Sequence, residues 1–177
     1  MFMKDVELKL ASELMKNSRR SDRELAKAVG VSQPTISRLI NKLEKDGVIK
    51  EYTMIPDFSK LGYELLAITF IRHRSLTAEE LDAITKMGMK RAKQVTLSEA
   101  IIAERGMGLG YDAVIVSYEK DYSTYLQHIK KLKQFPHLDS SNIQSFLINL
   151  NDEVHYRYLT FSTLARHLLS LKEKKEK

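Results

Sequence analysis

The chain has 177 residues, of which 43% are hydrophobic and 29% are charged, so it is long enough to bury a core in one domain or in two small ones. Its 29 basic and 23 acidic residues give a net charge of +6, which is compatible with a nucleic-acid partner without requiring one. Cysteine is absent, which excludes disulfides, thiolate nucleophiles and cysteine-ligated metals.

No segment of the sequence is suited to crossing a membrane. The first ten residues carry charges at Lys4, Asp5 and Glu7, so they lack the apolar stretch of a signal peptide. The longest apolar run, residues 65–71, is far too short to span a bilayer. We therefore expect a cytoplasmic protein that has no membrane partner.

Residues 3–16 predict a first helix, because apolar side chains recur there every three or four positions. This helix is expected to pack beneath the pair of helices that follows. Arg19 and Arg20 lie in the connection, directly before the second helix. Guanidinium groups beside unpaired backbone amides are suited to holding a phosphate, and two arginines in a solvated loop explain the pattern equally well.

Residues 21–47 have the pattern of a helix-turn-helix. Ser21 and Glu24 form a capping box at the start of one helix, and Gly30 ends that helix in the left-handed conformation. Ser32 is then expected to cap a second helix. The apolar residues of the second helix form one buried stripe, which consists of Ile36, Leu39, Ile40 and Leu43.

The opposite face of this second helix predicts contact with DNA. From Ser32 to Leu43 there is no Asp or Glu, whereas a helix that faces only water usually mixes both signs of charge. Amide and guanidinium groups suit the edges of bases, and lysine reaches phosphates. We assign groove contacts to Arg38 and Asn41, helped by Gln33, Thr35 and Ser37, and a phosphate contact to Lys42. Packing alone is the alternative explanation of such a helical pair.

The segment from Val48 to Ile55 favours extended structure, because it is rich in β-branched and aromatic residues and ends before a proline. A short strand after a recognition helix is the smallest form of a wing, and Lys50 on it is placed to contact a phosphate. Residues 57–61 predict a single helical turn that Gly62 ends. We place a domain boundary here.

The second half of the chain alternates strands and helices. The expected order is strand, helix, strand, strand, helix and strand, at residues 63–72, 77–91, 99–105, 113–118, 121–133 and 143–150. The first of these helices begins at Thr77, and the second begins at Asp121 or Ser123. The inward residues are Leu81, Ile84 and Met87 in the first helix, and Tyr125, Leu126, Ile129 and Leu132 in the second.

This order predicts a ferredoxin-like βαββαβ domain, with a four-stranded antiparallel sheet and both helices on one face. The fold class is therefore α+β: an N-terminal helix-turn-helix domain that resembles a winged helix, then a ferredoxin-like βαββαβ domain with an extra C-terminal helix. The other face of the sheet has no cover within the chain, so dimerisation through the sheets follows. The sequence does not say which face is taken by Ile68, Phe70, Ile102, Val114 and Val116.

No group of residues predicts a metal, nucleotide or catalytic site. The five histidines are scattered, and no pair has the helical spacing of metal ligands. Gly106, Gly108 and Gly110 precede a strand, whereas a dinucleotide-binding loop opens a helix, so we expect a hairpin there. Asp112 either orients the amine of an effector or binds its own loop. We expect neither a cofactor nor an enzymatic activity.

Three pieces of the sequence resemble the Lrp/AsnC family of bacterial and archaeal transcription regulators: the helix-turn-helix with the run ISRLINKLEKDGVIKEY, the linker FSKLGYELLAI, and the glycine-rich hairpin before Tyr111. The resemblance covers about residues 3–150. It implies a DNA-binding dimer formed by the sensor domains, which often stack into tetramers or octamers. Small effectors, commonly amino acids, bind between the sensor domains in that family.

Carried onto matching positions, the resemblance makes residues 33–45 the recognition helix and residues 107–112 the effector-binding loop. The effector contacts would be Met107, Gly108, Gly110, Tyr111 and Asp112. Two features depart from the family pattern. The run FPHLDSSN replaces a glycine-containing turn, which changes one wall of the usual pocket. A tail with Phe161, Leu164, Leu168 and Leu171 at helical spacing also follows the last strand, and it is placed to cover the sheet, extend the dimer or block a higher oligomer.

We expect a DNA-binding domain at residues 1–56, a linker at 57–62, a sensing and dimerisation domain at 63–152 and a C-terminal helical extension at 153–177. The expected function is sequence-specific transcription regulation by a dimer on double-stranded DNA. One rival is an enzyme on the same scaffold, similar to the siroheme decarboxylases, whose histidine-rich site is not seen here. The other is an assembly or metabolite-sensing protein whose helical domain contacts protein.

Overall fold

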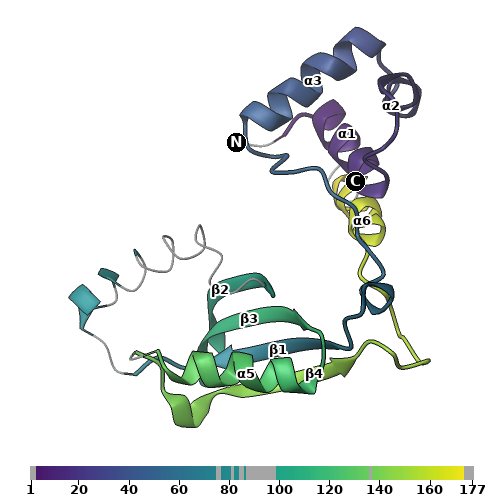
Figure 1. Cartoon of the computed structure of the whole chain (residues 1–177). Coiled ribbons are helices and arrows are strands. Elements are labelled where there is room, and N and C mark those ends of the chain that lie inside the picture. Colours follow the sequence, from purple (N-terminus) through teal and green to yellow (C-terminus); the bar gives the residue numbers. More distant parts are fainter. Residues whose placement is uncertain are drawn as a thin grey trace. The chain divides into compact units, whose positions relative to one another are not determined.

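The computed structural model describes residues 3–74, 77–80, 82, 83, 86, 99–135 and 137–173 (Figure 1). The chain divides into two compact units. The helical unit consists of residues 1–55 and 156–177, and the sheet unit consists of residues 56–155. The sheet unit is therefore inserted between two parts of the helical unit.

The helical unit contains four α-helices within the described residues: α1 (Asp5–Lys16), α2 (Asp22–Val29), α3 (Gln33–Lys45) and α6 (Ser162–Glu173). Within the described residues, the buried apolar side chains of its core come from α1, α2 and α3. They are Leu10, Leu25, Ala26, Val29, Ile36 and Leu43. The first helix therefore packs beneath the following pair, as the sequence predicts.

The C-terminal helix α6 packs against α1. The Ser12 hydroxyl donates a hydrogen bond of 3.0 Å to the Ala165 carbonyl, and both residues are fully buried. The predicted apolar stripe of the tail is rotated, because Phe161 and Leu164 are each 48% exposed while Ala165 faces α1. Small residues let the two helices approach closely, so the contact depends on Ser12 and Ala165 rather than on the larger apolar side chains.

The wing strand predicted between Val48 and Ile55 is wrong, since none of these residues pairs in a sheet. β-branched and aromatic residues favour a strand only where a neighbouring strand accepts its hydrogen bonds. Ile49 packs on the helical core, and the Tyr52 hydroxyl donates a 2.9 Å hydrogen bond to Glu44 on α3. The helical turn that follows is confirmed as Ser59–Leu61, ended by Gly62 with φ +79°.

The sheet unit contains four antiparallel strands in the order β2-β3-β1-β4. They are β1 (Leu65–Ile71), β2 (Ala100–Gly108), β3 (Tyr111–Glu119) and β4 (Gln144–Asn149). The predicted ferredoxin-like sheet is confirmed. Of the helix predicted from Thr77, the inward positions Leu81, Ile84 and Met87 lie outside the described residues. At its start, Thr77 and Glu80 exchange capping hydrogen bonds of 2.8 and 3.2 Å.

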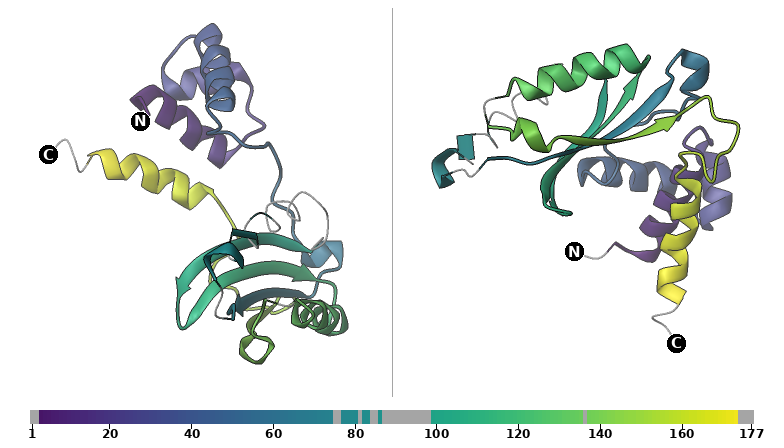
Figure 2. Two further views of the ribbon diagram at one scale, coloured as in Figure 1. Left: turned by 90° about the vertical axis from the view of Figure 1, so that its left-hand side faces the viewer. Right: turned by 90° about the horizontal axis from the view of Figure 1, so that it is seen from below.

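Helix α5 (Tyr122–Lys133) lies along one face of the sheet (Figures 1 and 2). Asp121 caps it by accepting a 2.7 Å hydrogen bond from the Thr124 amide, which decides between the two predicted starts. Leu132 and Ile129 pack against the sheet, as predicted. Leu126 is wrongly placed, because it is 48% exposed.

His128 on α5 is buried, although the predicted apolar stripe of this helix includes Leu126 and not His128. It is 5% exposed, and its Nδ1 lies 2.7 Å from Glu119 Oε1. The Ser117 hydroxyl donates to the same carboxylate oxygen at 2.7 Å. One of the five scattered histidines is therefore buried against the sheet. The sheet accepts an imidazole there because it supplies a buried carboxylate.

The strand register assigns the five apolar residues whose face the sequence left open. Ile71 and Ile115 pack on the α5 side with Leu132. Side chains alternate along a strand, so Ile68, Phe70, Val114 and Val116 point to the other face. Ile68 lies opposite Val116 and Phe146, and Val116 lies opposite Ile102, so these four side chains form one apolar row across all four strands.

The glycine-rich segment forms the predicted hairpin between β2 and β3. Leu109 and Gly110 at its tip have φ values of +53° and +80°. Two consecutive positive φ values are typical of a two-residue turn that follows the twist of the strands. The segment is therefore a strand connection, as expected.

Candidate nucleic-acid interface

Local capping fixes the turn between α2 and α3. The Glu24 amide donates to the Ser21 hydroxyl at 3.3 Å, and the Ser21 amide donates to the Glu24 carboxylate at 2.8 Å. Gly30 has φ +83°, and its amide donates to the Ala26 carbonyl at 2.9 Å. Ala26 is 9% exposed, so the small side chain lies at the helix crossing. The predicted capping box and turn glycine are confirmed.

Helix α3 turns a polar face outward from this core. Gln33, Ser37, Arg38 and Asn41 are exposed, whereas Ile36 and Leu43 on the other side are fully buried. Thr35 and Lys42 are half-buried at the edges of the exposed face. Ser32 precedes the helix, but its hydroxyl does not accept a backbone amide as predicted; it shares a 2.7 Å hydrogen bond with the Thr35 hydroxyl.

An acidic residue from α2 reaches this face, although the α3 sequence contains none there. Ser37 Oγ donates a 2.6 Å hydrogen bond to Asp22 Oδ2. Asp22 is the first residue of α2, where the positive end of the helix dipole favours a carboxylate. A reading of the α3 sequence alone misses it, because the two residues are brought together only by the turn.

Lys42 forms an ion pair with Glu7 of α1. The Lys4 amide also donates to Glu7, at 3.0 Å. The hydrogen bond from Lys42 lowers the pKa of Glu7 below its usual value, and the same contact raises the pKa of Lys42. The Lys42 side chain is 39% exposed, and its position at the edge of the polar face of α3 is set by a partner within the helical unit.

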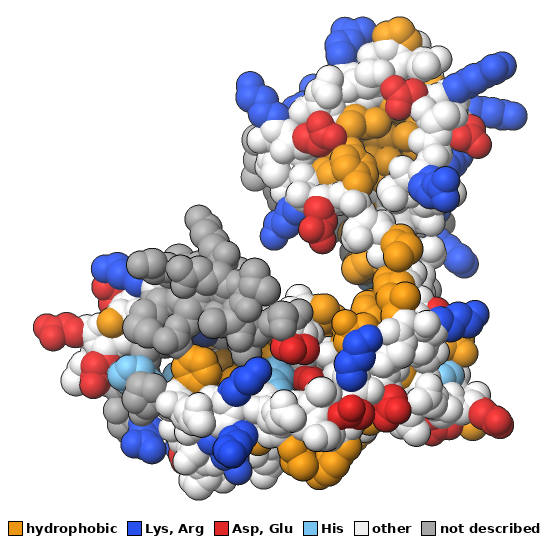
Figure 3. Space-filling view, in the orientation of Figure 1, with side chains coloured by type: hydrophobic (Ala, Val, Ile, Leu, Met, Phe, Trp, Pro, Cys, Tyr) orange, Lys and Arg blue, Asp and Glu red, His pale blue; other side chains and the backbone are white. Residues whose placement is uncertain are grey.

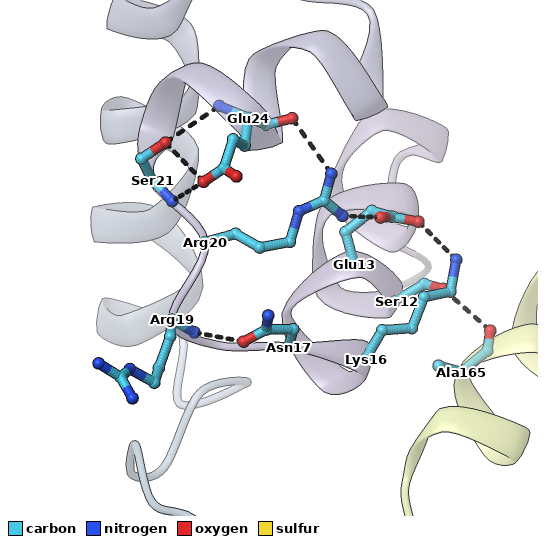
Figure 4. A network of polar contacts seen from close by, with 9 residues as sticks. All are labelled: Ser12, Glu13, Lys16, Asn17, Arg19, Arg20, Ser21, Glu24 and Ala165. Carbon is cyan, nitrogen blue, oxygen red and sulfur yellow. Dashed lines mark hydrogen bonds and ion pairs between the residues drawn. The ribbon is translucent and has the colours of Figure 1, made fainter.

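The two neighbouring arginines have different surroundings (Figure 4). Arg20 forms an ion pair with Glu13 and donates to the Glu24 carbonyl at 3.3 Å, so it joins α1 to α2. Lys16 and then Arg20 lower the pKa of Glu13. The Arg19 amide donates to Asn17 Oδ1 at 2.9 Å, while its side chain extends away from this network.

The surface of the helical unit carries both signs of charge. In Figure 3, Lys and Arg side chains project from several sides of it, with Asp and Glu side chains between them. Lys50 is exposed after the end of α3. On the face that Figure 3 draws, basic and acidic side chains of the helical unit are therefore intermixed.

The predicted effector loop lies at the β2–β3 hairpin. Met107 is 98% exposed, and the Tyr111 ring lies 5.7 Å from the Phe70 ring. Asp112 Oδ1 lies 2.6 Å from His73 Nδ1, and Asp112 Oδ2 accepts the His73 amide at 3.0 Å. Asp112 therefore binds the end of the neighbouring strand β1, a partner that the sequence did not indicate. Gly110 supplies one of the two positive φ values of the turn, and Gly108 is the last residue of β2.

Two other kinds of feature are absent from the described residues. No cluster of three or more His, Cys, Asp or Glu residues there is suited to hold a metal ion. No helix in that part of the chain has the length and apolar character needed to cross a membrane.

Comparisons with known proteins agree with this geometry. A family model described as winged helix-turn-helix DNA-binding matches residues 3–50. An uncharacterized HTH-type transcriptional regulator of Pyrococcus furiosus is 30% identical over 138 residues, which cover 78% of this chain and 86% of that protein.

Two solved structures share the fold. The crystal structure of an AsnC family transcriptional regulator from Agrobacterium tumefaciens has a TM-score of 0.70 at 22% identity, and covers 89% of this chain and 95% of that one. The L-Met complex of the transcriptional regulator NMB0573 from Neisseria meningitidis has a TM-score of 0.69 at 18% identity, with 92% and 99% covered.

Proposed function

Because the chain belongs to the Lrp/AsnC family of helix-turn-helix transcription regulators, we propose that it reads a two-part DNA site through two copies of α3 in a homodimer. In this proposal residues 1–56 form the DNA-binding domain and residues 57–62 form a linker. Residues 63–152 form the domain that senses a ligand and dimerises, and residues 153–177 form a helical extension. The observation that carries it is the polar face of α3, which the core holds outward.

The exposed residues of α3 divide into two roles. Arg38 and Asn41 contact base edges, because guanidinium and amide groups match the donors and acceptors of the major groove. Gln33, Thr35 and Ser37 share this work near the start of the helix. Phosphate contacts come from Arg19, Arg20, Lys42 and Lys50. Of these, Arg19 and Lys50 are the more exposed, whereas Arg20 and Lys42 already pair with acids of α1.

The open face of the sheet supplies the dimer contact. Ile102 is 46% exposed and Phe146 is 64% exposed at the two ends of the apolar row that also contains Ile68 and Val116. Burying such a row stabilises the dimer by about 25 cal/mol for each Å² of apolar surface that is removed from water. Two recognition helices about 34 Å apart would then enter successive major grooves, so the site is a pseudopalindrome. Further stacking of dimers gives the tetramer or octamer.

A small effector, such as an amino acid, shifts the equilibrium between arrangements of the sensor domains. Support comes from the likeness to the regulator solved with L-Met, and from the exposed hairpin of Met107, Gly108, Gly110, Tyr111 and Asp112. An effector acts only through a difference in affinity between two arrangements. Both oxygens of Asp112 contact His73, so an effector amine bound by Asp112 would share the carboxylate with that residue.

Selection of bound fragments from random DNA tests the function. We expect one enriched pseudopalindrome, bound with an affinity that falls steeply as salt rises, since neutralising phosphates releases counterions. Recovery of unrelated fragments, or an affinity that does not change with salt, would contradict DNA reading by α3. It would favour a protein partner for the helical unit.

A further inference from the structure

The chain connects the two units twice. It leaves the helical unit after Ile55 and returns to it at Tyr156. Both connections start from neighbouring strands of the sheet, because Leu65 at the start of β1 lies opposite Asn149 at the end of β4. The Leu150 amide donates to the Glu64 carbonyl at 2.8 Å. The sheet therefore holds the two connections side by side, about 5 Å apart.

The first connection is anchored at both of its ends. Ile49 packs on the helical core. At the sheet, the Phe58 ring stacks on Tyr118 with a centroid distance of 3.5 Å, and Lys120 Nζ donates to the Leu61 carbonyl at 2.8 Å. Residues 50–57 between these anchors reach at most about 25–30 Å when extended.

The second connection ends in α6, which the buried hydrogen bond from Ser12 to Ala165 holds against α1. Among the residues whose side chains the structure describes, the buried core cluster of the helix-turn-helix is formed without α6, by Leu10, Leu25, Ala26, Val29, Ile36 and Leu43. The docking of α6 is therefore not needed to fold the helix-turn-helix. What α6 adds is a second attachment of the sheet unit to the DNA-binding helices.

We propose that α6 makes the link between the two units a double tether, and that this tether restricts the half-site spacings that the dimer accepts. The inference rests on the proposed function of a DNA-binding dimer. A unit that is attached by one flexible connection can rotate about it. A unit that is attached by two connections has a narrower range of orientations, because both connections leave the sheet from neighbouring strands.

The double tether acts through effective concentration. Once one recognition helix has bound its half-site, the second one binds intramolecularly. A restricted range of orientations raises the effective concentration at the matching spacing and lowers it at the others. Releasing α6 is expected to weaken binding at the preferred spacing and to strengthen it at neighbouring spacings.

The test uses the full chain with Ala165→Glu, which places a long charged side chain at the closest approach of α1 and α6. Leu164→Ala is the matched control, because Leu164 is the preceding residue and is 48% exposed. Truncation after Asp152 is a second way to remove the tether. Hydrogen exchange should show α6 losing its protection in Ala165→Glu while α2 and α3 keep theirs.

Binding is then measured on duplexes whose half-site separation changes in small steps over one turn of DNA. We expect the ratio between the weakest and the strongest dissociation constant in the series to fall by about tenfold in Ala165→Glu and in the truncated chain, and to stay unchanged in Leu164→Ala. Identical profiles for all four proteins would overturn the double tether while leaving DNA reading intact. Absence of preferential DNA binding by the unaltered chain would overturn both.

Discussion

The helical unit and the sheet unit place their polar and apolar groups in opposite ways. In the helical unit the apolar side chains are closed inside three helices, and the polar face of α3 is exposed, with Lys42 at its edge paired to the buried Glu7. The sheet unit buries a His128–Glu119 pair beneath α5 and exposes apolar Phe146 on its other face. This difference supports the proposal that the helical unit presents a polar surface to DNA and that the sheet unit presents an apolar surface to a second copy.

The largest effect is expected from the buried pair of the sheet unit. His128→Ala leaves the fully buried Glu119 carboxylate without its imidazole partner, so the free energy of unfolding of the sheet unit should fall by about 3–5 kcal/mol. Denaturant unfolding measures this change. Replacing both residues by leucine should cost much less, because no buried charge remains. If the single variant were as stable as the unaltered chain, the pair would not be buried as described.

The apolar face of the sheet gives the next largest effect. Ile102→Glu combined with Phe146→Glu places carboxylates at the two ends of the apolar row, and dimerisation should weaken by about 2–4 kcal/mol. Sedimentation equilibrium measures the dimer dissociation constant. Leu126→Glu is the control, since Leu126 is exposed on α5, on the other side of the sheet. If the double variant and Leu126→Glu had the same dimer dissociation constant, the two copies would contact each other through a different surface.

The next effect is smaller and is a gain: DNA binding by the helical unit should become stronger. Asp22→Asn removes the carboxylate beside Ser37 and keeps a side chain that accepts its hydrogen bond. Binding to random duplex should become stronger by up to about 1 kcal/mol, because one repulsion of phosphate is lost. Fluorescence anisotropy at low and high salt measures this gain. A gain that does not shrink at high salt would contradict an electrostatic cause.

The smallest effect is the acid dependence of the helical unit. Lys16 and Arg20 lower the pKa of Glu13 below its usual 4.5, so this contact stabilises the folded state above that pH and is lost as the pH falls through the lowered pKa. Glu13→Gln should lower the melting temperature slightly at pH 6 and reduce its fall between pH 6 and pH 3. Thermal circular dichroism checks both. An unchanged pH profile would mean that Glu13 is not paired in solution.

Local patterns in the sequence predicted the parts of the fold that depend on neighbouring residues. The bounds of α3 follow from helical spacing and a turn glycine, and Gly30 has the expected conformation. The succession of strands along the sheet unit followed from the alternation of strand and helix patterns in the sequence. The wing strand failed because a strand needs a partner, which residues 48–55 do not reach.

Contacts between residues that lie far apart in the chain could not be predicted from the sequence. Nothing in the sequence of the tail indicates that Ala165 contacts Ser12. Nothing in the sequence of α5 indicates that His128 is buried, because its partner Glu119 lies on a strand. The same holds for the candidate site. The pattern selected the exposed residues of α3, but not Asp22, which the turn brings to Ser37. Periodicity reports which face a side chain takes, and it carries no information on the partner that it meets there.

The most direct measurement compares Arg38→Ala with Lys50→Ala on the selected DNA site and on random duplex. Arg38 is exposed on the groove face of α3, and Lys50 lies beyond its end. Arg38→Ala should cost about 1–3 kcal/mol on the selected site and little on random duplex, whereas Lys50→Ala should weaken both to a similar extent. Equal losses for Arg38→Ala on the two duplexes would contradict base reading by α3.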